Sequence, residues 1–451
     1  MSSPGDRAPV PAPATAVPTS VSEPVSVSNP AAPATAPPRV VLGIGGGIAA
    51  YKACELLRRL RADGFDVTAV PTAAALKFVG APTWEALSGR PVSDDVFSDI
   101  PSVAHVATGQ RADLVVIAPA TADLMAKAAT GQADDMLTAT LLVTRAPVLM
   151  APAMHTEMWA HPATVANTAT LRERGVVVID PAVGRLAGSD SGAGRLPEPE
   201  HLAALAGLLY RDPHSLRRDL AGRRIVISAG GTREPLDPVR YLGNRSSGRQ
   251  GYALALVAAA RGAEVTLVSA NVLLAEPPGV QVVRLTDARE LENAMVELSH
   301  EAAAVVMAAA VADFRPAASA PTKIKKIVDE EPEALALVKN PDILARLARP
   351  GAARARVVVG FAAETGDGSA DPMASVLAYA RDKLAGKGCD LLVVNRVDGG
   401  RAFEVAENAG LILAAEHGGA PAGVVAEIPL GPKTALAAAI CDAIAARLGR
   451  A

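Results

Sequence analysis

Short apolar runs alternate with amphipathic stretches along almost the whole chain after residue 38. In the first half, the runs predict strands at residues 40–44, 67–70, 114–118, 148–151 and 176–180, with helical patterns such as 48–60 between them. In the second half, they predict strands at residues 225–229, 265–269, 282–284, 304–308, 357–360 and 391–395. Buried strands that alternate with helices are typical of parallel, doubly wound α/β sheets.

The chain has 451 residues, which exceeds one compact core, so we predict an α/β fold with two doubly wound, Rossmann-like domains. Residues 1–38 are rich in Pro, Ala, Ser and Thr and predict a disordered tail. The remaining boundaries are a first domain over 39–200, a helical connector over 201–221 and a second domain over 222–451. Two segments interrupt the pattern: glycine-rich residues 184–199 predict a mobile flap or loop, and lysine-rich residues 317–333 predict a loop or lid.

Composition excludes several classes of protein. A net charge of −3 gives no electrostatic case for a nucleic-acid partner. The three cysteines are widely spaced, which argues against a disulfide framework or a zinc site. No apolar run is long enough to predict a membrane span, and the tail lacks the features of a signal peptide. We therefore expect a cytoplasmic protein that acts on small molecules.

The most informative segment of the second half is the loop at residues 240–248, Arg-Tyr-Leu-Gly-Asn-Arg-Ser-Ser-Gly. It follows the strand at 224–229 and the turn at 230–232, and a helical pattern at 252–260 comes after it. Such a connection presents backbone N–H groups to an anion. With three arginines in and before the loop, the sequence predicts a phosphorylated or carboxylated substrate.

The first half offers weaker candidates. The glycine turn at residues 45–48 either binds a mononucleotide phosphate or is simply a tight turn, because it lacks the full dinucleotide spacing. Residues 118–123, at another strand end, are a second candidate. His105 could act as a general acid or base, although a lone histidine is commonly structural. The Met and Trp residues at 154–159 either pack in the core or line a pocket for a flat ring.

Four of these motifs together resemble the FMN-dependent cysteine decarboxylase family: residues 46–52 (GGIAAYK), Ser102 with His105, residues 118–121 (APAT) and residues 152–159 (PAMHTEMW). With residues 231–248, the chain more closely resembles the bacterial bifunctional phosphopantothenoylcysteine decarboxylase/phosphopantothenate–cysteine ligase family of coenzyme A biosynthesis. The resemblance runs from about residue 39 to the C-terminus.

For the first domain, the resemblance implies that FMN oxidises the cysteine moiety of the substrate, which makes loss of carbon dioxide easier. It makes His105 the catalytic acid or base. The residues that it places against FMN are Gly46, Ile48, Thr72, Pro119, Thr121 and Met154.

Two positions of the first domain depart from the family pattern. His155 replaces an asparagine that binds the substrate carboxylate in relatives, and Gly188 stands where the flap cysteine protonates the product ene-thiol. The proton donor is therefore open among Ser189, Asp190, Ser191 and His155. We favour His155, because an imidazolium is an adequate acid near neutral pH.

For the second domain, the resemblance implies that 4′-phosphopantothenate attacks CTP to give an acyl cytidylate, from which cysteine displaces CMP. Asn244 would stabilise the intermediate, Lys323 would assist its formation, and Arg240 would bind substrate. The nucleotide-binding positions would be Met307, Ala308, Ala309, Asp313, Lys323, Asn340, Pro341, Asp342, Ile343, Phe361, Lys383 and Lys387. Mg²⁺ is expected at the triphosphate, with Asp313 as a ligand. If no nucleotide binds here, the lysines within residues 323–326 would simply be part of a solvated surface.

Two rival functions remain at this level. One is a ligase whose flavin domain has weakened and serves assembly, which the missing flap cysteine favours. The other is a flavoprotein regulatory subunit, which the complete ligase motifs argue against. Relatives of the flavin domain also lead us to expect a homo-oligomer, either trimer-based or a dodecamer.

Overall fold

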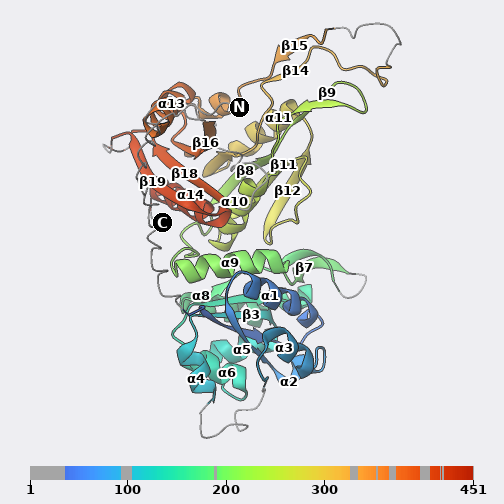
Figure 1. Cartoon of the computed structure of the whole chain (residues 1–451), viewed down its shortest axis with the longest axis vertical. Helices are drawn as coiled ribbons and strands as arrows, with labels where there is room; N and C mark the ends of the chain where they lie inside the picture. The colour runs from blue at the N-terminus through green and yellow to red at the C-terminus, as the bar shows by residue number, and fades with distance from the viewer. Residues whose placement is uncertain are drawn as a thin grey trace, which may run out of the picture. The chain divides into compact units, whose positions relative to one another are not determined.

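The computed structural model describes residues 36–92, 104–186, 190–325, 334–351, 354–364, 372–396, 407–416, 418 and 421–449 (Figure 1). The predictions for the tail up to residue 35, for Gly188 and Ser189, and for the end of the 317–333 loop lie outside these residues.

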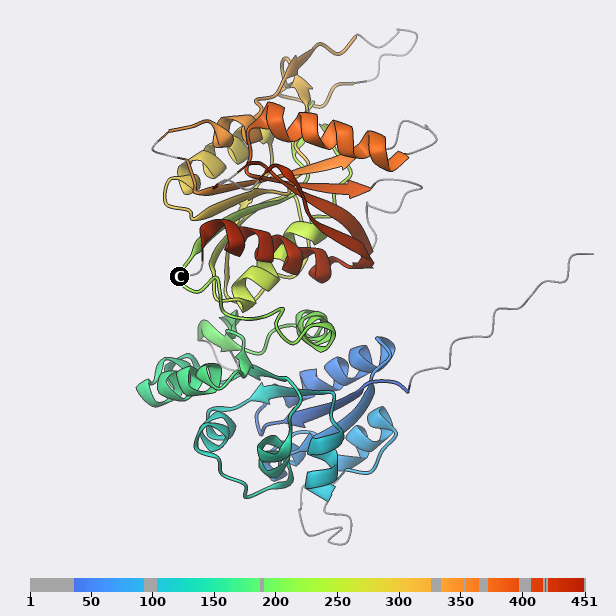
Figure 2. The same cartoon turned by 90° about the vertical axis from the view of Figure 1, so that its left-hand side faces the viewer.

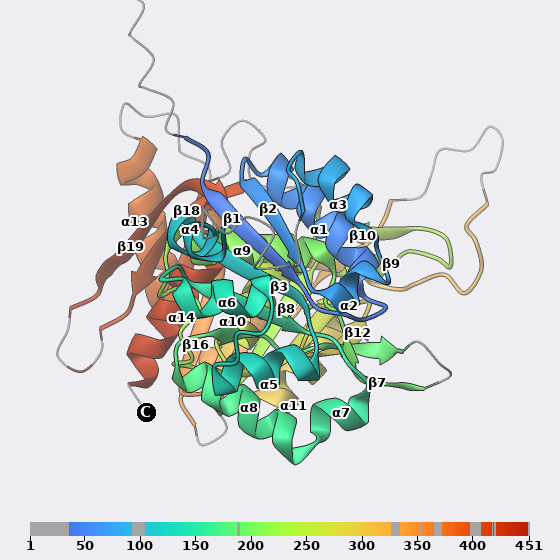
Figure 3. The ribbon, with the colours of Figure 1, turned by 90° about the horizontal axis from the view of Figure 1, so that it is seen from below.

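The first domain contains a five-stranded parallel sheet in the order β2-β1-β3-β4-β5. Figure 3 labels its strands β1, β2 and β3. The strands are β1 (Arg39–Ile44), β2 (Asp66–Pro71), β3 (Leu114–Ala120), β4 (Val148–Pro152) and β5 (Val177–Val178). All seven residues of central strand β3 are buried, because helices cover both faces of a parallel sheet. The five strands predicted from apolar runs are confirmed.

The helices of this domain are α1 (Ala50–Ala62), α2 (Ala73–Leu76), α3 (Ala81–Ser88), α4 (Ala104–Arg111), α5 (Ala122–Thr130), α6 (Met136–Val143), α7 (Thr156–Ala160), α8 (Pro162–Glu173) and α9 (Pro199–Arg211). None of the helices among the described residues is long and apolar enough to cross a bilayer.

The glycine-rich segment predicted as a loop is an antiparallel hairpin of β6 (Ala182–Arg185) and β7 (Ser191–Arg195). It packs closely on the start of α7, since the Met154 N–H donates to the Gly194 carbonyl at 2.9 Å. A Cβ at Gly194 would lie only 2.1 Å from the Met154 carbonyl oxygen. Glycine at this position therefore permits the contact between the two backbones.

The second domain contains an eight-stranded sheet in the order β12-β11-β8-β13-β16-β17-β18-β19. Six parallel strands were predicted and are confirmed: β8 (Arg224–Gly230), β11 (Glu264–Ala270), β12 (Val280–Leu285), β13 (Ala304–Met307), β16 (Val357–Glu364) and β17 (Leu391–Arg396). Their spatial order is that of the Rossmann fold. Two antiparallel strands, β18 (Glu407–Ala414) and β19 (Gly423–Pro432), extend the sheet and were not predicted.

Within the part of this domain that the structure describes, five helices and two small hairpins accompany the sheet. The helices are α10 (Arg249–Ala260), α11 (Ala288–Ser299), α12 (Ile343–Ala348), α13 (Pro372–Lys387) and α14 (Lys433–Leu448), and α10 and α14 pack side by side (Figure 2). The hairpins are β9 (Arg233–Pro235) with β10 (Tyr241–Gly243), and β14 (Phe314–Pro316) with β15 (Leu337–Lys339).

The prediction of a helical connector up to residue 221 is wrong for its second half. Helix α9 ends at Arg211, and the chain then turns, with the Ser215 hydroxyl donating to the Asp212 carbonyl at 2.6 Å. Pro213 explains the end of the helix, because the residue before a proline is disfavoured in the helical conformation.

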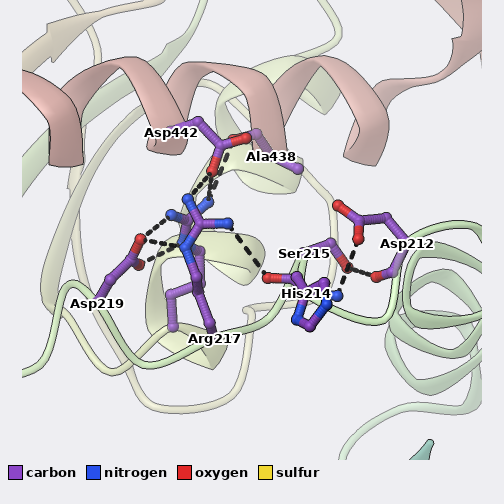
Figure 4. A network of polar contacts seen from close by, with 8 residues as sticks. Asp212, His214, Ser215, Arg217, Asp219, Ala438 and Asp442 are labelled. Atoms are coloured by element: carbon purple, nitrogen blue, oxygen red, sulfur yellow. Dashed lines mark hydrogen bonds and ion pairs between the residues drawn. The ribbon is translucent and has the colours of Figure 1, made fainter.

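A buried arginine, Arg261, attaches this turn region to the second domain. Figure 4 labels its partners Asp219, Ala438 and Asp442, together with the neighbouring Arg217. The Arg261 side chain is fully buried, and its Nε and Nη2 donate to the Asp219 carboxylate at 2.8 and 2.5 Å. Its Nη1 donates to Asp442 of α14 at 2.8 Å and to the Ala438 carbonyl at 3.2 Å. The guanidinium thus joins the segment before β8, the end of α10 and the C-terminal helix.

Replacing Arg261 with methionine should destabilise the domain strongly. The substitution keeps the packing volume but removes the buried one of the two guanidinium groups that contact Asp219 and Asp442, together with its bond to the Ala438 carbonyl, which costs about 2 kcal/mol of unfolding free energy. Calorimetry of the full chain measures the effect. Arg217→Met is the matched control, since Arg217 contacts the same two carboxylates from a side chain that is 47% exposed, and its loss should cost less than about 1 kcal/mol. Equal effects of the two substitutions would contradict the role given to Arg261.

Candidate active sites

The first candidate site lies where the strand order of the first sheet reverses, between β1 and β3. Helices that follow such neighbouring strands leave toward opposite faces, which opens a crevice at their carboxyl ends. The turn after β1 is tied to β3, because the Gly45 N–H donates to the Pro119 carbonyl at 3.0 Å. A Cβ at Gly46 would lie 2.3 Å from Ala74, so glycine lets this turn approach the loop after β2.

A cavity of about 870 Å³ occupies this crevice. The loops after β1, β2, β3 and β4 and the β6–β7 hairpin line it, and among the lining residues are the predicted FMN contacts Gly46, Ile48, Thr72, Thr121 and Met154. Pro119 is not among the lining residues and contributes through its bond to Gly45. The structure therefore gathers five of the six predicted positions around one cavity.

Two threonines shape the crevice by capping helices. The Thr72 hydroxyl oxygen accepts the Ala75 N–H at 3.1 Å, and that of Thr121 accepts the Leu124 N–H at 3.3 Å. Helix α1, in contrast, begins after Ala49, which provides no side-chain cap. The Ala50 and Lys52 N–H groups donate to the Gly47 and Ala49 carbonyls at 2.9 and 3.0 Å, so an anion at the glycine turn would rely on the other N–H groups of residues 47–51.

His105 lies in the first turn of α4 and is half-buried. It is not among the residues that line the cavity. Its Nδ1 is buried and has no hydrogen-bond partner among the residues that the structure describes. A buried ring nitrogen without a partner is unusual in a purely structural histidine.

His155 lines the cavity between two carboxylates. Its Nδ1 contacts Glu157, and its Nε2 lies 3.4 Å from Asp190 at the start of the second hairpin strand. The hydrogen bond to Glu157, helped by Asp190, raises the pKa of His155 above its ordinary value near 6.5. The imidazolium form therefore persists to higher pH than in an isolated histidine.

The second candidate site lies at the corresponding reversal in the second sheet, between β8 and β13. Beyond the sheet, the two following loops pair: the Ala310 N–H donates to the Gly230 carbonyl at 2.8 Å, and the Ala312 N–H donates to the Thr232 hydroxyl at 2.9 Å. The Asn244 amide joins them by donating to the Val311 carbonyl at 2.9 Å. The exposed Asn244 side chain is thus fixed above the switch point.

The predicted nucleotide-binding residues gather along the same edge. Met307 ends β13 and pairs in register with Gly360, next to Phe361 on β16. The Asn340 side-chain amide donates to the Ala312 carbonyl at 2.8 Å, and the Asn340 backbone N–H donates to the Asp313 carbonyl at 2.9 Å. The structure therefore connects the end of β15 to the loop after β13.

The start of α12 completes this edge. Asp342 caps the helix, accepting the Ala345 N–H at 3.0 Å, and pairs with Lys387 of α13. Lys383 lies one turn earlier on α13. Ile343 is buried, so that position would contribute only its backbone.

Asp237, to which the sequence assigned no role, organises the remaining predicted residues. Its fully buried carboxylate accepts the Arg240 Nε and Nη2 at 3.0 and 2.6 Å and the Ile324 N–H at 3.1 Å. The Arg240 guanidinium holds the pKa of Asp237 well below its usual range. Arg240 also donates to the Ile324 carbonyl at 2.8 Å, so the pair fixes the exposed segment that carries Lys323.

Two cavity residues were also missed. Lys52 and Arg195 line the first cavity, although the sequence gave them no function. Lys52 belongs to the segment 46–52 that carried the resemblance, and its position in the first turn after the glycine loop was the available signal.

The described residues contain no group of three or more His, Cys, Asp or Glu side chains that could hold a metal ion. Asp313, the predicted Mg²⁺ ligand, is exposed. A magnesium ion at this edge would accordingly take most of its ligands from a nucleotide and water, as Mg²⁺ often does.

Comparison with known proteins assigns each half of the chain to a protein family. The Flavoprotein family matches residues 31–206, and the family described as DNA/pantothenate metabolism flavoprotein C-terminal domain matches residues 220–448. The chain is 56% identical over 413 residues to the Mycobacterium tuberculosis (strain H37Rv) coenzyme A biosynthesis bifunctional protein CoaBC, covering 90% of this chain and 96% of the relative. Its identity to the Vibrio parahaemolyticus protein of the same name is 44%, with 82% and 90% covered.

Solved structures match each half separately. The C-terminal domain of a CoaBC protein is 32% identical with a TM-score of 0.41, covering 51% of this chain and 98% of that one. A PPC decarboxylase mutant complexed with pantothenoylaminoethenethiol is 30% identical with a TM-score of 0.36, covering 39% and 100%. The chain belongs to the family of coenzyme A biosynthesis bifunctional proteins, with a flavoprotein decarboxylase domain followed by a ligase domain.

Proposed function

We propose that the chain carries out two consecutive steps of coenzyme A biosynthesis. The second domain joins cysteine to 4′-phosphopantothenate at the expense of CTP, and the first domain decarboxylates the resulting 4′-phosphopantothenoylcysteine to 4′-phosphopantetheine. The observation that carries the proposal is the position of each set of motif residues at the switch point of its own sheet.

In the first domain, the turn at 45–48, Thr72, Thr121 and Met154 would hold FMN. The cavity volume and the uncapped start of α1 support this fit, since the helix N-terminus can receive the cofactor phosphate. When bound, FMN accepts electrons from the cysteine moiety and later returns them. His105 would move the substrate proton, and its unpartnered buried Nδ1 supports that role.

His155 would bind the substrate carboxylate and later protonate the ene-thiol left by decarboxylation. Its place on the cavity wall and its raised pKa support the role of acid. Asp190 connects it to the hairpin, which would close over the bound substrate.

In the second domain, Asn244 would stabilise the acyl cytidylate with the part of its amide that does not contact Val311. Lys323 would assist attack on the α-phosphate, and Arg240 would bind the substrate. Met307–Ala309, Asn340–Ile343, Phe361, Lys383 and Lys387 would surround CTP. Asp313 would provide Mg²⁺ with a carboxylate beside the triphosphate, where the ion would neutralise charge.

The direct test supplies purified chain with 4′-phosphopantothenate, CTP, Mg²⁺ and cysteine. We expect a yellow protein that releases CMP, pyrophosphate and carbon dioxide and forms 4′-phosphopantetheine. In Asn244→Asp, mass spectrometry should find the acyl cytidylate accumulating while CTP still binds. Accumulation of 4′-phosphopantothenoylcysteine without carbon dioxide would support instead a ligase with a weakened flavin domain.

His155→Asn, which installs the residue typical of the family, should retain FMN but yield an oxidised, decarboxylated product in place of 4′-phosphopantetheine. In the unmodified enzyme, product reduction should decline as the pH rises through the raised pKa of His155, because the donor is lost. Glu157→Gln should move this decline to lower pH, since Glu157 is the main cause of the shift. A normal yield of 4′-phosphopantetheine from His155→Asn would eliminate the donor role.

Asp237→Asn should lower pyrophosphate release by about tenfold or more, because it removes the charge-assisted bonds that fix Arg240 and the Lys323 segment. Decarboxylation of added 4′-phosphopantothenoylcysteine by the same preparation is the internal control and should not change. Normal pyrophosphate release would show that this carboxylate is dispensable to the ligase.

A further inference from the structure

Three charged side chains form a connected group at the wall of the first cavity. Lys52 of α1 and Arg195 of β7 both line the cavity. The Lys52 Nζ lies 3.1 Å from each carboxylate oxygen of Glu198. The Arg195 Nη2 lies 2.5 Å from the Oε1 of the same carboxylate. Glu198 is not among the lining residues, so the shared carboxylate holds both cations from behind.

The group has one more positive charge than its carboxylate can balance. The Lys52 side chain is only 14% exposed, so its charge acts in a partly desolvated setting. Arg185, on the other strand of the hairpin, adds a further guanidinium to the lining. Lys127 also lines the cavity, and it pairs with both Asp123 and Asp134, at 3.5 and 3.0 Å.

A phosphate monoester fits this group. An ammonium and a guanidinium together offer a point charge and a planar fork of donors, which suits phosphate oxygens. Both FMN and the proposed substrate carry such a phosphate. The proposed function already assigns the FMN phosphate to the glycine turn before α1, on the part of the cavity formed by the ends of β1 to β3.

The substrate phosphate is the better candidate for the charged group. Arg195 ends β7, the hairpin strand whose Gly194 carbonyl accepts the Met154 N–H next to His155, and Glu198 lies three residues later. The hairpin therefore places Arg195 on the side of the cavity assigned to the substrate carboxylate, and Glu198 connects it there to Lys52 of α1.

We propose that Lys52 and Arg195, positioned by Glu198, form a subsite for the terminal phosphate of the decarboxylase substrate. The inference rests on the proposed function of the first domain. It adds the reason why the domain would distinguish 4′-phosphopantothenoylcysteine from its unphosphorylated counterpart.

The test compares these two substrates in the full FMN-loaded chain. Lys52→Met and Arg195→Met should each raise KM for the phosphorylated substrate by about tenfold or more, as expected for loss of a charge-assisted bond. KM for the unphosphorylated substrate should stay within about twofold, and Lys52→Arg should keep most of the discrimination. Arg59→Met is the matched control, since Arg59 is on the same helix and pairs with Glu55 at 3.0 Å, away from the cavity.

Two further measurements distinguish the subsite from a site for the FMN phosphate and from a failure of the proposed function. If the pair held the FMN phosphate instead, both variants would lose the preference for FMN over riboflavin, and that result would overturn the proposal. Substrate-induced changes in flavin absorbance report binding without turnover. If carbon dioxide is released from neither substrate, the proposed function fails, yet a binding preference for the phosphorylated compound that depends on Lys52 would still support the subsite. Equal binding of both compounds by the unmodified chain would overturn it.

Discussion

The two candidate sites depend on one topological constraint, the reversal of strand order within a parallel sheet. Chain connections in such sheets are right-handed, so the helices on either side of the reversal cover opposite faces. The reversal falls between β1 and β3 in one domain and between β8 and β13 in the other. Loops from strands that are far apart in the sequence meet at each of these points.

The two domains use this constraint differently. In the first, the loops surround a cavity of about 870 Å³, and a hairpin adds one wall through the backbone contact at Gly194. In the second, the loops after β8 and β13 bond directly to each other, and Asn244 and Asn340 attach two further segments to them. A cavity suits a flat cofactor together with its substrate, whereas two loops that bond to each other suit a nucleotide that lies along the edge of the sheet.

The sequence predicted the parallel strands because buried strands are almost continuously apolar, as the fully buried β3 illustrates. It failed for β19, which is largely exposed at the sheet edge and contains Pro429 and Pro432. For residues 184–199 the glycines predicted a flap or loop, but not the strand pairing of β6 with β7, because glycine is uncommon in strands and this pairing depends on contacts with residues 154–156.

Motif resemblance located the candidate residues, but not the residues that position them. Asp237 contacts Ile324, which is 87 positions away, and Lys52 contacts Glu198, which is 146 positions away. No local periodicity reports such pairs, so their role becomes visible only when the fold brings them together. The residues that hold the sites in place were therefore harder to predict than those expected to contact ligands.

Hydrogen exchange of the full chain, followed by mass spectrometry, tests most directly whether FMN and CTP occupy separate switch points, one in each domain. Added FMN should slow exchange at residues 44–49 and 121–125, and CTP with Mg²⁺ should slow it at 228–232 and 307–312. Neither ligand should protect the segments assigned to the other. Protection of the first set by CTP, or no protection of the β8 and β13 loops at saturating CTP, would contradict the account.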